Sequence, residues 1–288
     1  MLSPEFLQQL EQLSLAVRRL RRGQGQGTLL SRRRGRSPEF SDFRPYVPGD
    51  EPRFIDWNIW GRLEQLATKL FLEEEALEVR LVIDTSASMG NKFPFTAELA
   101  AALGYLALAG GSRIRLAAPR PGGDYPPDTS PALKGKSAFP RLLAFLEKLR
   151  PGGKMPLSAL GVAAAGFRSG GLDIFLSDFL DADAGARAAL QAAARRGTEL
   201  YAVQILSPEE LNPPLDGAVR IDGLEDGETL DLHGGRELGD AYRRTLDEYC
   251  QDVADQCREC GAGYWCLSSG ENLQAAVLLS LRRAGLVR

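Results

Sequence analysis

The sequence has little of what several protein classes require. Its 288 residues contain one histidine, which leaves no histidine-rich metal cluster. They contain only four cysteines, which indicates a reducing compartment. It has no uninterrupted apolar run of about 18 residues, which a transmembrane helix needs. Its first ten residues lack the basic start and apolar stretch of a signal peptide. The net charge of −3 argues against a general nucleic-acid binder. We therefore expect a cytoplasmic protein without a membrane span.

The charge is unevenly spread along the chain. Residues 1–40 hold eight arginines, no lysine and three glutamates, so they carry +5 and the remaining residues carry −8. Such a run is typical of a docking surface for an acidic partner, RNA or anionic lipid, or of a solvated face that meets the acidic body of its own chain. No aromatic residue interleaves with the arginines as in stacking binders, which favours the second interpretation. The arginines are Arg18, Arg19, Arg21, Arg22, Arg32, Arg33, Arg34 and Arg36.

From residue 79 onward, apolar runs alternate with segments of helical spacing. The runs at 79–83, 172–176 and 199–206 are continuous, which is typical of strands buried on both faces. This alternation predicts an α/β fold with a mostly parallel sheet flanked by helices. Ligands of such sheets bind at the carboxyl ends of the strands, where Asp84 and Asp178 stand.

The remaining segments divide the chain. We expect residues 1–75 to form an N-terminal segment that begins with a helix over 4–22, and residues 76–288 to form the main domain. Within that domain, residues 207–235 are rich in proline, glycine and aspartate. They predict a β-containing insertion.

Three oxygen-bearing side chains follow the first buried run. Asp84, Ser86 and Ser88 form an Asp-x-Ser-x-Ser loop, and alternate residues of an extended loop can point the same way. Carboxylate and hydroxyl oxygens suit Mg²⁺ or Mn²⁺, and Asp178 can reach the same crevice from a separate strand. The sequence therefore predicts a divalent-cation site at these four residues. The alternative is that they only hydrogen-bond the loop and cap the following helix.

Two stretches resemble known families. Residues 79–89, VRLVIDTSASM, resemble the first motif of a von Willebrand factor A domain, whose metal-ion-dependent adhesion site uses such a loop. Residues 39–57, EFSDFRPYVPGDEPRFIDW, with Arg62 and Lys69, resemble the signature of the DUF58 family of bacterial proteins. The resemblance implies a von Willebrand A-like (Rossmann-like) domain with an N-terminal extension. It also implies a MoxR-type AAA+ ATPase as partner, and remodelling, maturation or metal insertion of a client protein as the task.

The family pattern also implies a ligand set for the cation. The two serines would ligate it directly, the two aspartates would act largely through water, and a threonine would supply a third hydroxyl. Met155 stands at the threonine position, beside Lys154. A thioether is a poor ligand for Mg²⁺. We therefore hypothesise that Lys154 reaches Asp84 or Asp178 and replaces the cation by an internal ion pair.

Charges of alternating sign run through an aromatic stretch at residues 43–62. One interpretation is a buried salt-bridge network that holds this segment to the main domain. The other is a partner surface, because Trp, Tyr and Arg are frequent interface anchors. The candidate partner-binding residues are Arg44, Tyr46, Asp50, Arg53, Asp56, Trp57, Arg62 and Lys154.

Two further classes find little support. A phosphatase of the haloacid dehalogenase type needs a second aspartate two residues after Asp84, where this chain has serine, and the lone His233 leaves no Ser-His-Asp arrangement. Cys257 and Cys260 form a Cys-x-x-Cys motif, but they share one face of a predicted helix with Cys250, which favours buried thiols over zinc. We therefore predict a non-enzymatic protein-interaction module.

Overall fold

The chain folds into two units in a computed structural model. The large unit comprises residues 1–22 and 77–288, and the small unit comprises residues 23–76. The arginine-rich run at 18–36 lies outside the described residues. The structure describes residues 2–13, 15, 39–72, 77–120, 126–165, 170–180, 185–194, 198–214, 218–222, 229–233 and 235–287.

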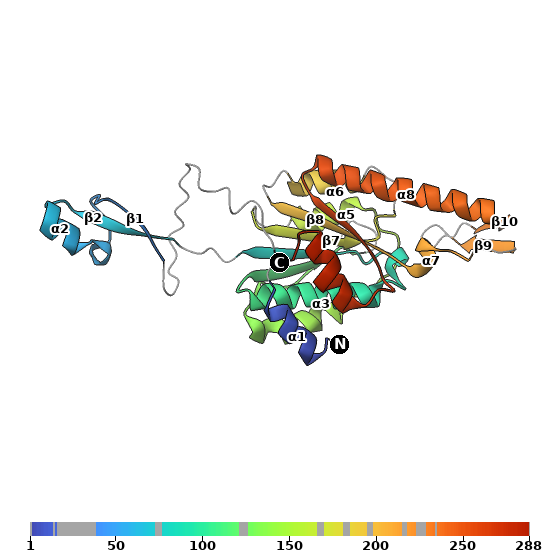
Figure 1. Ribbon diagram of the computed structural model, residues 1–288, viewed down its shortest axis with the longest axis horizontal. Helices are drawn as coiled ribbons and strands as arrows, with labels where there is room; N and C mark the ends of the chain where they lie inside the picture. Colours follow the sequence, from blue (N-terminus) through green and yellow to red (C-terminus); the bar gives the residue numbers. More distant parts are fainter. Residues whose placement is uncertain are drawn as a thin grey trace. The chain divides into compact units, whose positions relative to one another are not determined.

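The large unit is built on a mostly parallel sheet (Figure 1). Its strands are β3 (Glu78–Ile83), β4 (Arg113–Ala118), β5 (Asp128–Thr129), β6 (Leu133–Lys134), β7 (Leu172–Ser177), β8 (Glu199–Leu206) and β11 (Gly263–Ser268). The strand order is β11-β8-β7-β3-β4-β5, and β6 also pairs with β4. Only β5 and β6 run antiparallel to their neighbour. The chain leaves β3 on one side and returns as β7 on the other, so β3 lies at a topological switch point.

Helices cover both faces of this sheet, as predicted (Figure 1). Alternate residues of β3 point to opposite faces: Val79, Leu81 and Ile83 join one core, and Val82 joins the other. The first core is covered by α1 (Pro4–Glu11), α3 (Phe93–Ala109), α4 (Phe139–Leu146) and the C-terminal stretch α9 (Leu273–Ala275), η5 (Ala276–Ser280) and α10 (Leu281–Arg283). The second is covered by α5 (Ser158–Ala165), α6 (Gly185–Ala194) and α8 (Arg236–Glu259).

The N-terminal helix differs from the prediction in length and in place. It ends at Glu11, not at residue 22, and Leu15 instead forms an antiparallel bridge with Val287. Phe6 and Leu10 on its apolar face are buried in the first core. Because this burial ties α1 to the sheet, the helix belongs to the large unit rather than to a separate N-terminal segment.

The predicted insertion begins with α7 (Pro208–Leu211), a short helix whose Ser207 and Glu210 form a capping box. It continues with β9 (Ala218–Asp222) and β10 (Thr229–His233), which pair antiparallel. The β-containing character predicted for this segment is therefore present. Among the described residues, no helix combines the length and the apolarity that crossing a membrane would take.

The small unit consists of two paired strands, with two short helical segments between them in the sequence. β1 (Glu39–Pro45) and β2 (Ala67–Leu72) run antiparallel. Between them lie η2 (Pro52–Phe54), a 3₁₀ turn, and α2 (Trp57–Leu63). α2 ends where Glu64 adopts a left-handed conformation, with φ of 52°.

Candidate functional site at the strand ends

The two predicted aspartates meet at the carboxyl edge of the sheet. Asp84 follows β3 and Asp178 follows β7, and these strands are paired up to Ile83 and Leu176. The amide of Asp84 continues the pairing by donating to the Leu176 carbonyl at 2.9 Å. Both aspartates are buried. We call Asp84, Ser86, Ser88 and Asp178 the strand-end site.

The Asp84 carboxylate organises the loop that follows it. Its Oδ1 accepts from the Ser86 amide at 2.8 Å, and its Oδ2 accepts from the Ser177 hydroxyl at 2.5 Å. The hydroxyl oxygens of Ser86 and Ser88 lie 2.9 Å apart. Burial, and secondly the negative charge of Asp178, raise the pKa of Asp84 to about 6. The two hydroxyls and the carboxylate thus converge as the spacing predicted.

The loop that should supply the third hydroxyl also lies against the strand-end site. The Gly152 amide donates to the Thr85 carbonyl at 2.9 Å, and the Ala87 amide donates to the Gly153 carbonyl at 3.0 Å. Met155, in the place of the expected threonine, is buried. Lys154 is exposed and makes no ion pair with any described residue. The ion pair hypothesised for Lys154 is made by another lysine.

That lysine is Lys92, the residue before α3. Its ammonium donates to Asp178 Oδ2 at 2.7 Å and to Glu210 Oε1 at 2.5 Å. The Lys92 side chain has no solvent exposure, whereas that of Glu210 is 26% exposed. Neither Lys92 nor Glu210 was predicted from the sequence. A lysine between the strand-end loop and an alanine- and leucine-rich helix was the available signal, because such a charge must either reach solvent or find a carboxylate.

Further hydrogen bonds extend the site across the sheet. The Gln204 side chain on β8 donates to the Asp178 carbonyl at 2.7 Å, and the Tyr264 hydroxyl on β11 donates to the Gln204 amide oxygen at 2.6 Å. The second carboxylate oxygen of Glu210 accepts from the Ser207 amide at 2.6 Å. Polar contacts therefore lead from the end of β7 through Gln204 within β8 to Tyr264 near the start of β11.

The donor set of the strand-end site does not fit a divalent cation. Met155 offers no hard oxygen. Both Asp84 oxygens are engaged as described, and Asp178 accepts from the Leu180 amide at 3.2 Å and from Lys92. No group of three or more His, Cys, Asp or Glu among the described residues is placed to hold a metal. Binding of Mg²⁺ or Mn²⁺ at these residues stays a prediction, and the donor set argues against it.

In the small unit, the predicted acidic residues pair internally. Asp50 accepts from Arg44 at 2.5 Å and from the Val47 amide at 3.0 Å. Asp56 caps α2 by accepting from the Asn58 amide at 2.8 Å, and its other oxygen lies 3.0 Å from the Lys69 ammonium. These hydrogen bonds, from Arg44 to Asp50 and from Lys69 to Asp56, lower the pKa of both carboxyls. Their role here is to hold the unit together.

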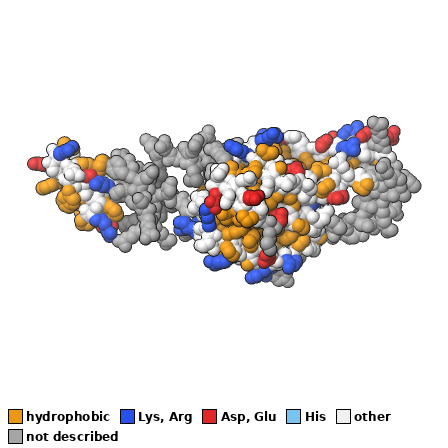
Figure 2. Space-filling model, turned by 60° about the horizontal axis from the view of Figure 1, so that its bottom comes forward, with side chains coloured by type: hydrophobic (Ala, Val, Ile, Leu, Met, Phe, Trp, Pro, Cys, Tyr) orange, Lys and Arg blue, Asp and Glu red, His pale blue; other side chains and the backbone are white. Residues whose placement is uncertain are grey.

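Two predicted partner residues of the small unit, Trp57 and Arg62, are exposed on α2, as are Trp60 and Leu63, which were not predicted as partner residues. Trp57, Trp60 and Leu63 on α2 are 60%, 50% and 66% exposed, and the two indoles meet edge to face with centroids 6.4 Å apart. Arg62 is exposed and forms no ion pair with described residues. We call Trp57, Trp60 and Leu63 the aromatic face. Hydrophobic side chains are visible on the surface of the small unit in Figure 2.

Two of the predicted partner residues in the small unit belong neither to the internal pairs of Asp50 and Asp56 nor to the aromatic face. Tyr46 is half-buried, and its amide donates to the Leu66 carbonyl at 2.9 Å. Arg53 is exposed, pairs with Glu51 and lies over the Phe54 ring. The Tyr46 bond continues the pairing of β1 and β2, whereas the Arg53 contacts are local to η2.

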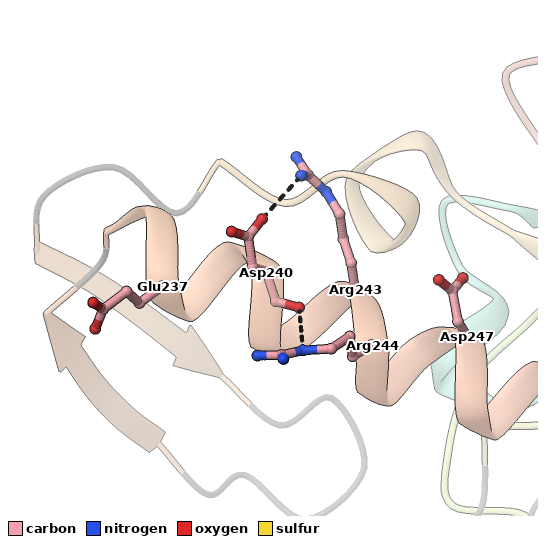
Figure 3. Close-up of a pocket in the computed structure, with 5 residues that line it drawn as sticks. All are labelled: Glu237, Asp240, Arg243, Arg244 and Asp247. Atoms are coloured by element: carbon pink, nitrogen blue, oxygen red, sulfur yellow. Dashed lines mark hydrogen bonds and ion pairs between the residues drawn. The ribbon is translucent and has the colours of Figure 1, made fainter.

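A charged concavity of about 590 Å³ lies on α8 (Figure 3). The described residues that line it all come from that helix: Glu237, Asp240, Arg243, Arg244 and Asp247. Asp240 pairs with Arg243 at 3.6 Å, with both side chains more than half exposed. Pairs of this kind on one solvated helix contribute little, and the charges do not converge on a common point. We assign no site to this surface.

The cysteines lie where α8 packs on the sheet. Cys257 is buried in the second core, and burial raises its pKa to about 12. Cys250 is half-buried, and its hydrogen bonds with Cys266 and Tyr264 hold its pKa below the usual range. All four cysteines are free thiols. The helix predicted through Cys250, Cys257 and Cys260 is confirmed up to Glu259, with Cys260 as its C-cap.

The strand order and the helices on both faces define an α/β protein with a mostly parallel sheet. The family model described as "Protein of unknown function DUF58" matches residues 42–251, and the chain belongs to this family. Uncharacterized proteins of Mycobacterium bovis (Mb1516) and Mycobacterium tuberculosis (Rv1480) are each 25% identical over 291 residues, covering 98% of this chain and 91% of theirs.

The similar solved structures include proteins from two further bacteria. The conserved hypothetical protein BatB from Bacteroides thetaiotaomicron is 15% identical, with a TM-score of 0.42, over 73% of this chain and 98% of that one. A von Willebrand factor type A protein from Catenulispora acidiphila is 10% identical, with a TM-score of 0.37, over 76% and 43%. The fold class follows from the strand order and helix placement described above.

Proposed function

We propose that this protein is a non-enzymatic interaction module that works with a MoxR-type AAA+ ATPase in remodelling, maturation or metal insertion of a client protein. Membership of the DUF58 family supports a von Willebrand A-like interaction module. The resemblance of the segment at 39–57 to the family signature is the ground for naming the ATPase.

The aromatic face carries this proposal. Of the eight large hydrophobic side chains that are exposed among the described residues, six lie between Phe43 and Leu66 of the small unit. Exposed clusters of this kind mark interaction sites, and tryptophan and arginine dominate the binding energy of interfaces. Asp50 and Asp56 hold the small unit together through their internal pairs, and the side chains of the aromatic face take no part in those pairs.

The test is the affinity of the full chain for the MoxR-type ATPase of the same genome, measured by calorimetry with the ATPase in its ATP-bound state. Replacing both indoles, W57A/W60A, should weaken binding at least about 30-fold, because hot-spot residues contribute about 2 kcal/mol or more. The matched control is Val162→Ala on α5, an equally exposed apolar residue of the large unit, which should leave the affinity unchanged.

Two outcomes would contradict the proposal. Unchanged affinity in W57A/W60A would move the interface away from the aromatic face. Absence of binding between the wild-type chain and the ATPase would remove the ATPase as the partner.

A further inference from the structure

The backbone fixes where the Lys92 side chain starts. Its amide donates to the Met89 carbonyl at 3.0 Å, and its own carbonyl accepts from the Thr96 amide and the Thr96 hydroxyl, both at 3.0 Å. These bonds join the turn after the Asp-x-Ser-x-Ser loop to the first turn of α3. The side chain that leaves this point is fully buried, so its ammonium is delivered to the carboxyl edge of the sheet.

The ammonium joins three parts of the fold at that edge. Lys92 comes from the start of α3, Asp178 from the end of β7, and Glu210 from α7 after β8. A buried lysine is tolerated when carboxylates compensate its charge, and here two do so at hydrogen-bond distance. Lys92 donates to Oδ2 of Asp178, so this oxygen is already engaged by a cation of the chain.

A second cation would meet unfavourable conditions at this place. Beside the ammonium it would experience like-charge repulsion in a buried environment, where charges are weakly screened. It would find the two serine hydroxyls and the thioether of Met155, but no third hydroxyl on that loop. The incomplete donor set and the positive charge of Lys92 are independent observations, and both argue against a divalent cation at this site.

We propose that the Lys92 ammonium is the resident cation of the strand-end site, and that it holds the ends of β7 and β8 to the start of α3 without any divalent metal. This inference goes beyond the proposed function and does not depend on the identity of the partner.

The first experiment uses the wild-type full chain after treatment with a chelator. Titration with MgCl₂ and with MnCl₂ by calorimetry should show no saturable binding up to millimolar concentrations. The midpoint of thermal unfolding should be the same in chelator, in Mg²⁺ and in Mn²⁺, because a ligand that bound only the folded state would raise it.

The second experiment replaces the lysines. Lys92→Met keeps a long side chain but leaves buried carboxylates unpaired, and the midpoint should fall by roughly 10 °C. The control is Lys154→Met, which removes the exposed lysine first suspected of this role and should leave the midpoint unchanged. Lys92→Arg keeps the charge and should recover part of the loss.

A third variant gives a readout that a merely structural lysine would not give. Lys92→Ala removes the cation and leaves space between Asp178 and Glu210, so Mn²⁺ should raise its midpoint of unfolding although it leaves that of the wild type unchanged. If Lys92→Ala does not fold, the titration of the wild type with MgCl₂ and MnCl₂ still tests the proposal.

The proposal is overturned if the wild type binds Mg²⁺ or Mn²⁺ saturably and S86A/S88A loses that binding. It is also overturned if Lys92→Met unfolds at the wild-type temperature, because the ammonium would then hold nothing together.

Discussion

The two units use charged and aromatic side chains in opposite ways. In the large unit, Arg80, Lys92, Asp173 and Asp178 are all at most 2% exposed, and each is paired. In the small unit, Trp57 and Trp60 are half exposed or more. Globular domains normally bury their aromatic residues and solvate their charges. Each unit departs from this rule at a different point: buried charges hold the large unit together, and the exposed indoles carry the binding role that we propose.

The buried pairs of the large unit fix positions more than they add stability. The desolvation of two charges offsets much of their attraction, but removing one partner leaves the other buried and unpaired. The pair of Arg80 and Asp173 joins β3 to β7, and that of Lys92 and Asp178 joins β7 to α3. The first pair lies near the amino ends of its two strands, and the second lies at the strand-end site.

The largest effect should come from the buried pair of Arg80 on β3 and Asp173 on β7. Arg80→Met leaves Asp173 buried without its guanidinium, which should cost about 4 kcal/mol in the free energy of unfolding, measured by urea denaturation. The control is Arg115→Met on β4, whose partner Glu78 lies at 3.3 Å and whose side chain is 39% exposed. That variant should cost less than about 1 kcal/mol.

Removing both partners of the buried pair separates its charge from its volume. R80M/D173L should recover most of the loss, because neither charge is then left unpaired. A double variant as unstable as Arg80→Met would mean that packing, and not charge, sets the cost.

A smaller difference is expected between the two carboxylates on Lys92. Asp178→Asn should lower the free energy of unfolding by about 3 kcal/mol, because it removes a 3% exposed partner of a buried ammonium. Glu210→Gln should cost about 1 kcal/mol, because water can replace a partner that is 26% exposed. Equal losses in urea denaturation would show that α7 is held as tightly as the end of β7.

The sequence predicted the convergence of Asp84 and Asp178, but not the cation that joins the site. Continuous apolar runs identify buried parallel strands, and parallel strands bring their carboxyl ends to one edge. Asp178 and Glu210, however, lie 86 and 118 residues from Lys92. Nothing local in the sequence encodes such a pairing. Arg80 in a buried strand posed the same problem, because its partner Asp173 is 93 residues away.

The small unit was the harder part to predict. β1 and β2 are separated by 21 residues, 46–66, far more than the two to five residues of an ordinary hairpin loop. The charges at 43–62 suggested either a salt-bridge network or a partner surface. In the structure Asp50 and Asp56 pair inside the small unit rather than with the main domain, and Trp57 and Trp60 are exposed. The partner surface stays a prediction.

The smallest effect should be the acid sensitivity of the small unit. Its folded state lowers the pKa of Asp50 and Asp56, so their contribution is fully present above the unfolded pKa of about 4 and is lost as the pH falls through the lower folded values. The three tryptophans are Trp57, Trp60 and Trp265, so W265F confines the fluorescence to α2. Its emission should stay constant from pH 7 to about pH 4 and change below. D50N/D56N in the same background should remove this step, whereas a change between pH 7 and pH 5 would show that groups other than these two carboxylates hold the aromatic face in place.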